Sequence, residues 1–285
     1  MTEHPANAPA PRLSFEFFPP RTEGGQASLG RVAEKLNQLH PAFFSCTYGA
    51  GGSTREGTCE TVKQLLEMGI DAAPHLSIGA DSEEETSALL DLYRDMGVKR
   101  IVALRGDLPS GMGRTPIVNN AESLVKRIRA HSGNHFQLEV AAYPETHPDA
   151  RSPQEDLRFF SEKVNAGDNG AITQYFFNPY AYFDFMDRSI RAGVDVPIVP
   201  GILPITNYEG LIRISEKCGA DVPRWLRKRL EELQDDEPGL KSFGVDVITR
   251  LCEDLLAAGA PGLHFYTLNR WGASLAVCNN LGHWA

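Results

Sequence analysis

The chain has 285 residues, of which 42% are hydrophobic and 23% are charged, and its formal net charge is -9. This composition supplies a large apolar core and excludes a disordered chain, and the acidic balance argues against a surface that binds nucleic acid. No stretch is long and apolar enough to span a membrane, and the first residues do not resemble a signal peptide, so we expect a cytoplasmic protein.

Short apolar runs alternate with longer stretches of helical periodicity along the chain. Residues 1–12 are rich in Pro and Ala and are expected to form a mobile tail, followed by one domain over residues 13–285. Eight strands are predicted, at Leu13–Phe17, Phe43–Thr47, Ala72–Leu76, Arg100–Leu104, Gln137–Ala142, Ala171–Phe176, Pro197–Ile202 and Gly262–Thr267. Helices are predicted between them, at Ser28–Leu39, Thr54–Met68, Ser82–Met96, Ala121–His131, Pro153–Ala166 and Tyr180–Ala192.

Glycines stand where the predicted helices should end. Gly is favoured at this position because it accepts a positive φ, and the five are Gly69, Gly97, Gly133, Gly167 and Gly193. The connection between Ile202 and Gly262 is longer than the others, and extra helices are predicted in it at Tyr208–Lys217, Arg224–Leu233 and Phe243–Ala258. Eight similar units favour a (β/α)8 TIM barrel over a doubly wound open sheet.

Polar side chains recur at the ends of the predicted strands. In a closed barrel these ends converge on one mouth, where barrel enzymes bind their substrates. The residues concerned are Glu16, Thr47, Tyr48, His75, Arg105, Asp107, Tyr143, Glu145, His147, Gln174, Asn269 and Arg270. Their positions predict an active site.

Glu16 lies among aromatic rings and prolines, and strand alternation directs its side chain opposite to those of Phe15 and Phe17. It is a candidate general acid, although a carboxylate paired with a buried Arg or Lys is an equally good interpretation. Asp107 is either a second functional carboxylate or a turn residue that binds its own backbone. Arg270 could bind a carboxylate-bearing substrate or form a salt bridge.

Metal binding is not favoured by the pattern of possible ligands. His75 and His147 occur without an HxH or HExxH motif, so hydrogen-bonding roles are expected for both. The five cysteines are widely spaced and contain no CxxC, which argues against a zinc site and a disulfide framework. The glycines at 49–52 could bind an anion or form a plain tight turn. Residue types alone therefore predict a barrel enzyme without naming its reaction.

Ordered motifs along the chain resemble the bacterial methylenetetrahydrofolate reductase family. They span roughly Leu13 to Leu281 and read, in one-letter code, FEFFPP from Phe15, TYGAGGSTR from Thr47, APHL from Ala73, LRGD from Leu104, AYPE from Ala142, ITQ from Ile172, PGILP from Pro200 and HFYTLNR from His264.

The resemblance implies a barrel that binds FAD and passes a hydride from NADH to 5,10-methylenetetrahydrofolate by a ping-pong mechanism, giving the 5-methyltetrahydrofolate that supplies methyl groups for methionine synthesis. It implies Glu16 as general acid, Asp107 as a charge beside flavin and pterin, and Gln174, Arg270 and Asp107 as substrate-binding residues. It assigns cofactor binding to Thr47, Tyr48, Ala50, His75, Arg105, Gly106, Asp107, Ala121, Tyr143, His147, Ala150, Asp156 and Lys163. It also implies a homo-oligomer.

Two positions depart from the family pattern. Phe159 stands where the family has a cofactor-contacting Asn, and Glu162 where it has an Arg. These changes leave the adenosine and diphosphate contacts of FAD open. Two other functions also remain open: a pterin or folate enzyme that works without flavin, such as a methyl transferase, and a binding protein that has kept the barrel but lost turnover.

Overall fold

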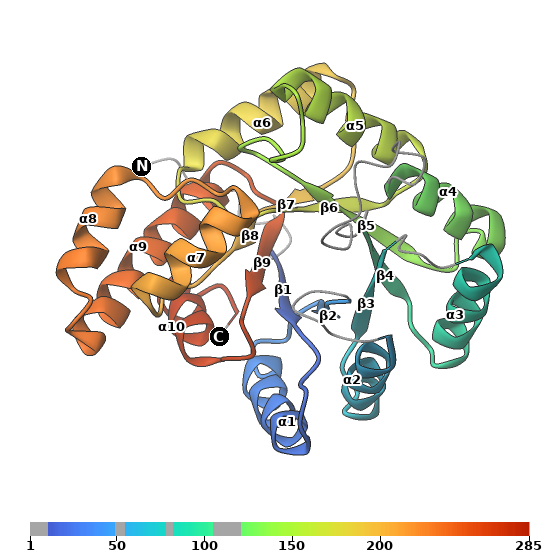
Figure 1. Cartoon of the computed structure of the whole chain (residues 1–285), viewed down its shortest axis with the longest axis horizontal. Helices are drawn as coiled ribbons and strands as arrows, with labels where there is room; N and C mark the ends of the chain where they lie inside the picture. Colours follow the sequence, from blue (N-terminus) through green and yellow to red (C-terminus); the bar gives the residue numbers. More distant parts are fainter. Residues whose placement is uncertain (1–10, 49–54, 78–81, 105–120, 285) are drawn as a thin grey trace.

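The strands form one closed ring surrounded by helices (Figure 1). The computed structural model describes residues 11–48, 55–77, 82–104 and 121–284. Within them the sheet order is β7-β6-β5-β4-β3-β2-β1-β9-β8, and the neighbouring strands are parallel. Because β7 and β8 follow each other along the chain, the two ends of this order meet. The fold is therefore the predicted (β/α)8 TIM barrel.

The strands are β1 (Arg12–Phe17), β2 (Phe43–Cys46), β3 (Ala72–Ser77), β4 (Arg100–Leu104), β5 (Gln137–Ala142), β6 (Gly170–Thr173), β7 (Ile198–Val199), β8 (Gly201–Ile202) and β9 (Gly262–Tyr266). All eight predicted strand positions are occupied, but the seventh is divided at Pro200 into β7, which pairs with β6, and β8, which pairs with β9. Proline has no N–H to donate to a ladder, whereas its carbonyl oxygen still accepts a hydrogen bond from the backbone N of His264 at 3.0 Å.

The helices are α1 (Glu23–Asn37), α2 (Arg55–Glu67), α3 (Glu83–Asp95), α4 (Ala121–Ser132), α5 (Pro153–Asn165), α6 (Pro179–Arg191), α7 (Tyr208–Cys218), α8 (Arg224–Glu232), α9 (Glu237–Ala257) and α10 (Gly272–Leu281). The three extra helices predicted before the last strand are α7, α8 and α9. Two helices begin earlier than predicted because Thr22 and Asp236 cap them through their side chains. No helix in the described ranges is long and apolar enough to cross a bilayer.

The glycines predicted to end helices do so. Gly69, Gly97, Gly133, Gly167 and Gly193 all have positive φ, between 54° and 111°. Each follows the last turn of a helix and directs the chain toward the next strand. The regular spacing of these residues therefore sets the length of the outer helices.

The interior of the barrel is partly polar. A small apolar cluster there consists of Phe43, Ala73, Val102 and Ile172. Below it Arg100, which begins β4, forms a buried ion pair with Glu139, and the guanidinium lies 4.6 Å from the centre of the Phe43 ring. Burial raises the pKa of Glu139, and the charge of Arg100 opposes that shift. The opposite end of the barrel, where the strands finish, is the mouth.

Candidate active site

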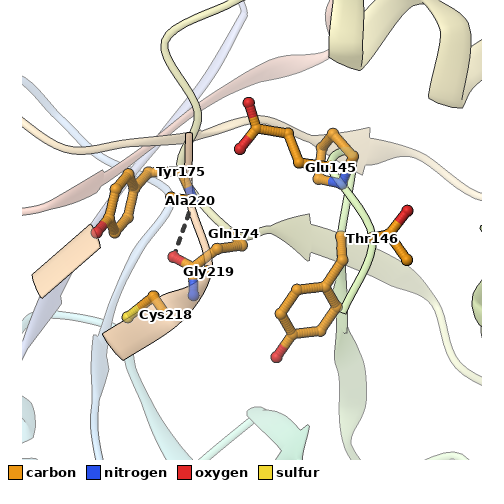
Figure 2. A pocket seen from close by; sticks show the side chains of 9 residues that line it. Glu145, Thr146, Gln174, Tyr175, Cys218, Gly219 and Ala220 are labelled. Atoms are coloured by element: carbon orange, nitrogen blue, oxygen red, sulfur yellow. Dashed lines mark hydrogen bonds between the residues drawn. The ribbon is translucent and has the colours of Figure 1, made fainter. Parts of the chain in front are cut away.

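A small pocket lies at the mouth between the segment after β5 and the end of α7 (Figure 2). It is lined by Tyr143, Pro144, Glu145, Thr146, Gln174, Tyr175, Cys218, Gly219 and Ala220. Gln174 follows β6 directly, its backbone N donates to the carbonyl of Ala142, and its Oε1 accepts from the backbone N of Tyr175 at 3.0 Å. Tyr143 and Gln174, which were predicted separately to bind cofactor and substrate, therefore share one pocket.

Glu145 forms a hydrogen bond between this pocket and the α7–α8 connection. Its Oε2 accepts a hydrogen bond from the backbone N of Asp221 at 2.9 Å. Burial raises the pKa of Glu145, and this hydrogen bond opposes the shift. The carboxylate thus joins two segments that are 76 residues apart in sequence.

Three further residues predicted to bind the cofactor, His147, Ala150 and Asp156, form one cluster where the loop after β5 leads into the first turn of α5. The rings of Tyr143 and His147 meet edge to face with centroids 4.5 Å apart. The backbone N of His147 donates to Oδ2 of Asp156 at 2.9 Å, and its Nδ1 accepts from the backbone N of Asp149 at 3.0 Å. Ala150 closes the loop through a backbone hydrogen bond to His147 at 2.9 Å. The loop is therefore held in a defined conformation by its own side chains.

The side chain of Lys163 lies against the barrel wall. Its Nζ donates to the carbonyl of Ala141 and lies 5.5 Å from the centre of the Phe160 ring. Phe159 and Glu162, the two positions expected to differ from the family pattern, both contact Arg158, which pairs with Glu162 at 3.0 Å and lies 4.6 Å from the centre of the Phe159 ring. Ala121, the first residue of α4, is buried.

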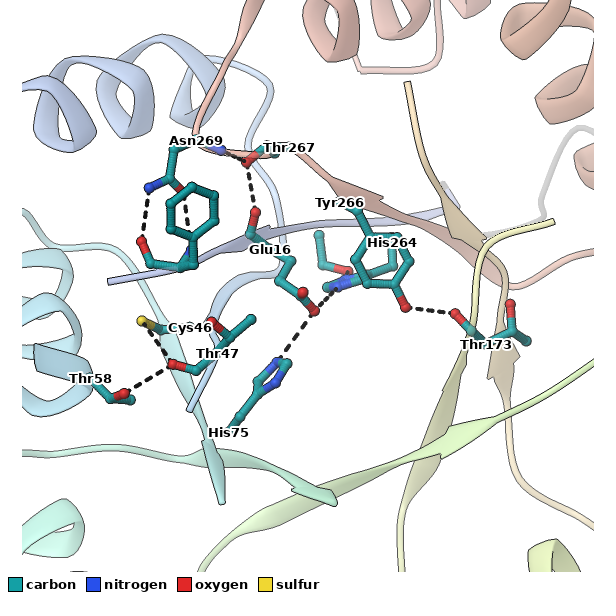
Figure 3. A network of polar contacts seen from close by, with 12 residues as sticks. Glu16, Cys46, Thr47, Thr58, His75, Thr173, His264, Tyr266, Thr267 and Asn269 are labelled. Carbon is teal, nitrogen blue, oxygen red and sulfur yellow. Dashed lines mark hydrogen bonds and ion pairs between the residues drawn. The ribbon is translucent and has the colours of Figure 1, made fainter. Parts of the chain in front are cut away.

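Glu16 meets two histidines at the mouth (Figure 3). Its Oε2 lies 3.4 Å from Nε2 of His75, on β3, and 3.5 Å from Nε2 of His264, on β9. The side chain of Glu16 is 18% exposed, whereas those of His75 and His264 are 7% and 0% exposed. The carboxyl group thus stands at the boundary between the packed interior and the open mouth, as a proton donor to a bound substrate requires.

The backbone around Glu16 is fixed from the turn after β9. The hydroxyl of Thr267 donates to the carbonyl of Glu16 at 2.7 Å. The side-chain amide of Asn269 accepts from the backbone N of Phe18 at 3.0 Å and donates to its carbonyl at 2.8 Å. Leu268 and Asn269 both have positive φ, 51° and 56°, which is uncommon for residues other than Gly. Strained backbone of this kind clusters at functional sites.

The ends of β2 and β3 carry buried polar atoms that suit a polar ligand. Thr47 is buried, and its Oγ1 has no hydrogen-bond partner among the described residues. The same holds for Nε2 of His75, whose 3.4 Å contact with Glu16 lacks hydrogen-bond geometry. Burial lowers the pKa of His75 more strongly than Glu16 raises it, which favours the neutral ring. Such atoms are costly unless a ligand or water satisfies them.

The remaining predicted residues lie apart from this cluster or outside the described ranges. Arg270 is exposed at the rim, where its backbone N donates to the carbonyl of Thr267 at 3.0 Å. Tyr48 is half-buried at the last described position after β2. Outside the described residues lie Ala50, Arg105, Gly106 and Asp107. The described residues include no group of three or more His, Cys, Asp or Glu side chains placed to hold a metal ion.

Sequence reasoning did not select Ser14 and His264 as site residues. Ser14 Oγ lies 2.7 Å from Nδ1 of His264, and both residues are buried. The signal for Ser14 was its place two residues before Glu16, on the same face of the strand. His264 carried no comparable signal, because only the pairing of the first strand with the last puts it opposite Ser14.

Comparisons with known proteins agree with one another. A family model described as methylenetetrahydrofolate reductase matches residues 1–282. The 5,10-methylenetetrahydrofolate reductase of Escherichia coli strain K12 is 39% identical over 272 residues, covering 95% of this chain and 90% of that protein. The Arabidopsis thaliana protein named methylenetetrahydrofolate reductase (NADH) 1 is 35% identical over 284 residues, covering 95% of this chain and 48% of that protein.

A solved structure supports the fold. It is described as an uncharacterized protein from Clostridium thermocellum that binds two copies of 5-methyl-5,6,7,8-tetrahydrofolic acid. Its TM-score is 0.65 at 16% sequence identity, with 96% of this chain and 94% of that chain covered. At this identity the likeness concerns the barrel and not its ligand. The family model and the sequence relatives, in contrast, span nearly the whole chain, and the chain therefore belongs to the methylenetetrahydrofolate reductase family.

Proposed function

We propose that this protein reduces 5,10-methylenetetrahydrofolate to 5-methyltetrahydrofolate, using FAD as cofactor and NADH as electron donor in a ping-pong reaction. The product would supply methyl groups for methionine synthesis. The family membership supports the reaction, and the Glu16 carboxyl between two buried histidines at the mouth is the structural observation that carries the proposal.

Glu16 is the proposed general acid. Protonation of the bridging nitrogen of the folate opens its five-membered ring and leaves an iminium carbon that accepts a hydride. Glu16 suits this role because its carboxyl reaches the mouth while its backbone is fixed by Thr267. The neighbouring His75 is favoured in its neutral form by burial, so it adds no full charge beside the acid.

The residues at the mouth fit a polar cofactor. The unpartnered Oγ1 of Thr47 and Nε2 of His75 would be satisfied by polar atoms of such a group. When bound, FAD supplies the hydride-transfer chemistry. The described residues proposed to hold it are Thr47, Tyr48, His75, Ala121, Tyr143, His147, Ala150, Asp156 and Lys163. Ala50, Arg105, Gly106 and Asp107 belong to the same proposal.

Three residues are proposed to recognise the substrates. Gln174 would orient the folate and meet the nicotinamide from the pocket that it shares with Tyr143. Arg270 would bind the carboxylate end of the folate, since a guanidinium at the rim can form paired hydrogen bonds with a carboxylate. The negative charge of Asp107 would favour the cationic iminium.

An anaerobic titration in two steps tests the proposal. The purified protein should be yellow with a flavin spectrum, NADH should bleach that spectrum, and methylenetetrahydrofolate should then restore it. A colourless protein that still acts on a folate would instead indicate the flavin-free enzyme. A protein that binds folate but gives neither colour change would indicate a binding protein without turnover.

The same titration addresses the electron donor. The plant relative carries NADH in its name, which supports NADH as donor for this chain. Bleaching rates with NADH and NADPH at equal concentrations should favour NADH. A faster reaction with NADPH would overturn this part of the proposal without affecting the folate step.

A further inference from the structure

His264 is buried, and each of its two ring nitrogens has a polar neighbour. The ring is 0% exposed and stacks on Phe43 with centroids 6.1 Å apart, while Tyr266 meets it edge to face at 5.3 Å. Its Nδ1 lies 2.7 Å from Ser14 Oγ, and its Nε2 lies 3.5 Å from Glu16 Oε2. The ring is therefore set between a hydroxyl and the proposed acid.

The strand register produces this arrangement. Ser14 is the direct partner of His264 in the β1–β9 ladder, and Glu16 is the partner of Tyr266. Ser14 and Glu16 lie two residues apart, so their side chains leave the same face of β1. The imidazole consequently reaches Glu16 from the position opposite Ser14.

We propose that Ser14 and His264 form a positioning pair that holds the Glu16 carboxyl in both of its protonation states. This inference deepens the proposed function and rests on it for the role of Glu16 as acid. A serine hydroxyl both donates and accepts, and a neutral imidazole has one donor and one acceptor. The pair can therefore present either a proton or a lone pair to the carboxyl.

The two states differ by one proton. When Glu16 is a carboxylate, His264 donates from Nε2 to it and Ser14 donates to Nδ1. When Glu16 is a carboxylic acid, its O–H donates a hydrogen bond to Nε2 of His264, and the N–H at Nδ1 donates a hydrogen bond to Ser14 Oγ. The extra proton belongs to the set of three residues, and it leaves through Glu16 when the folate nitrogen is protonated. Every polar atom in the chain of contacts stays satisfied in both states.

The charged surroundings of His264 come from several strands. Glu16 and His75 lie on the mouth side. The Phe43 ring contacts both the imidazole of His264 and the guanidinium of the Arg100–Glu139 ion pair. The hydroxyl of Tyr266 is directed away, toward the carbonyl of Thr173 at 2.7 Å.

The decisive variant is Ser14→Ala. Without the hydroxyl, Nδ1 is buried without a partner, and an unpaired acceptor is tolerated better than an unpaired N–H. The ring should therefore keep its proton on Nε2, facing Glu16, which favours the carboxylate over the acid. We expect the titration midpoint of the Glu16 carboxyl to fall by about half a unit or more, and the folate half-reaction at pH 7 to slow by roughly 3- to 10-fold.

Two measurements on the full-length protein separate this proposal from the proposed function. The first follows Glu16 by carbon NMR of glutamate-labelled protein, with its signal identified by its loss in Glu16→Gln, and needs no folate. The second is the pH profile of flavin reoxidation by methylenetetrahydrofolate. Suppose that Ser14→Ala differed from the parent protein in the NMR titration as expected, but that methylenetetrahydrofolate did not reoxidise the flavin of the parent. The proposed function would then fail while the positioning pair stood.

Matched variants provide the controls. Ser14→Thr retains a hydroxyl and should restore the midpoint and the rate to within about twofold, and Ser14→Val, of the same shape, should not. Ser189→Ala removes a buried hydroxyl on α6 that has no hydrogen-bond partner in the described part of the chain, and it should change neither quantity. An unchanged midpoint in Ser14→Ala, or the same midpoint in the Thr and Val variants, would overturn the proposal. The Thr and Val pair decides the matter if the Ala variant does not fold.

Discussion

Glu16 is the residue on which the proposed chemistry depends. Its carboxyl combines partial access to the mouth with contacts to two buried imidazoles. Among the described residues its contacts are with His75 and His264, and not with the buried Arg or Lys that the sequence left open as an alternative. The exposed part of the side chain leaves the carboxyl accessible from the mouth.

Replacement of Glu16 by Gln should separate the two half-reactions. The amide has nearly the same shape but cannot donate a proton as an acid, so folate reduction should slow by roughly 10²- to 10⁴-fold. Flavin content and reduction by NADH should be unchanged, because neither requires that proton. Stopped-flow absorbance under anaerobic conditions measures both steps. Retention of folate reduction in this variant would show that the acid has been assigned wrongly.

Asp168 is a buried carboxyl at the end of the barrel where the strands begin, opposite to the mouth. It lies just before β6, is 8% exposed, and neither of its oxygens has a hydrogen-bond partner among the described residues. Burial raises its pKa to about 7, while Lys163 opposes the shift and Glu139 adds to it. A folded-state pKa above the unfolded value means that stability is full at low pH and is lost as the pH rises through about 7.

Asp168→Asn should therefore stabilise the protein more at pH 8 than at pH 5. The amide removes the cost of a buried charge, and the difference between the two pH values should be about 1–3 kcal/mol in the free energy of unfolding. Urea unfolding at both pH values measures it. Asp195→Asn, at an exposed carboxylate before β7, is the control and should show a difference below about 0.5 kcal/mol. Equal effects of Asp168→Asn at both pH values would contradict the buried-charge explanation.

At the level of the elements, the turn after β9 links the last strand to the first. Leu268 and Asn269 take left-handed backbone conformations, and the Asn269 amide makes two hydrogen bonds to the backbone of Phe18. This turn therefore fixes the chain immediately after Glu16. Asn tolerates the left-handed region better than most residues, and its amide is both a donor and an acceptor. The same residue can therefore form the turn and hydrogen-bond both backbone groups of Phe18.

Asn269→Ala should destabilise the protein by about 2–4 kcal/mol, because it loses two hydrogen bonds and puts at positive φ a residue that tolerates this conformation less well than Asn does. Folate reduction should weaken while NADH-dependent bleaching is retained. Thermal unfolding and the two half-reactions are the measurements. Asn269→Gly keeps the backbone conformation available, and it should recover about 1 kcal/mol of stability without recovering the folate step. Equal stability of the two variants would mean that backbone strain contributes nothing here.

At the level of the whole molecule, barrel closure depends on the short segment at Pro200 and Gly201. A Cβ on Gly201 would lie 2.1 Å from the carbonyl oxygen of Thr173 and 2.6 Å from the Tyr266 ring. Its backbone N also donates to Thr173 Oγ1 at 2.9 Å. The two edges of the sheet therefore meet where no side chain fits.

Gly201→Ala should accordingly destabilise the barrel by about 3 kcal/mol or more, since the atoms in the way are backbone and a buried ring. Gly24→Ala in α1, where a Cβ would meet nothing within 4 Å, is the matched control and should be neutral or stabilising by up to about 1 kcal/mol. Denaturant unfolding of both variants tests this. A Gly201→Ala protein as stable as its parent would show that the sheet closes with more room than the structure indicates.

Local features of the sequence determined the alternation of strands and helices, the glycine stops and the position of Glu16 at a strand end. These features depend on φ preferences, hydrophobic periodicity and the alternation of side chains, which act within a few residues. They also predicted the extra helices α7 to α9. The family motifs extended the prediction to a reaction, because several of them occur in a fixed order.

Tertiary structure alone decided how distant residues meet. The division of the seventh strand at Pro200 follows from the need to pair with β6 on one side and β9 on the other. The contact of Ser14 and His264 crosses 250 positions of the sequence and exists only because the first and last strands are neighbours in a closed ring. Hydrophobic pattern specifies which face of a strand is buried, whereas the partner on that face is set by the register of the whole sheet.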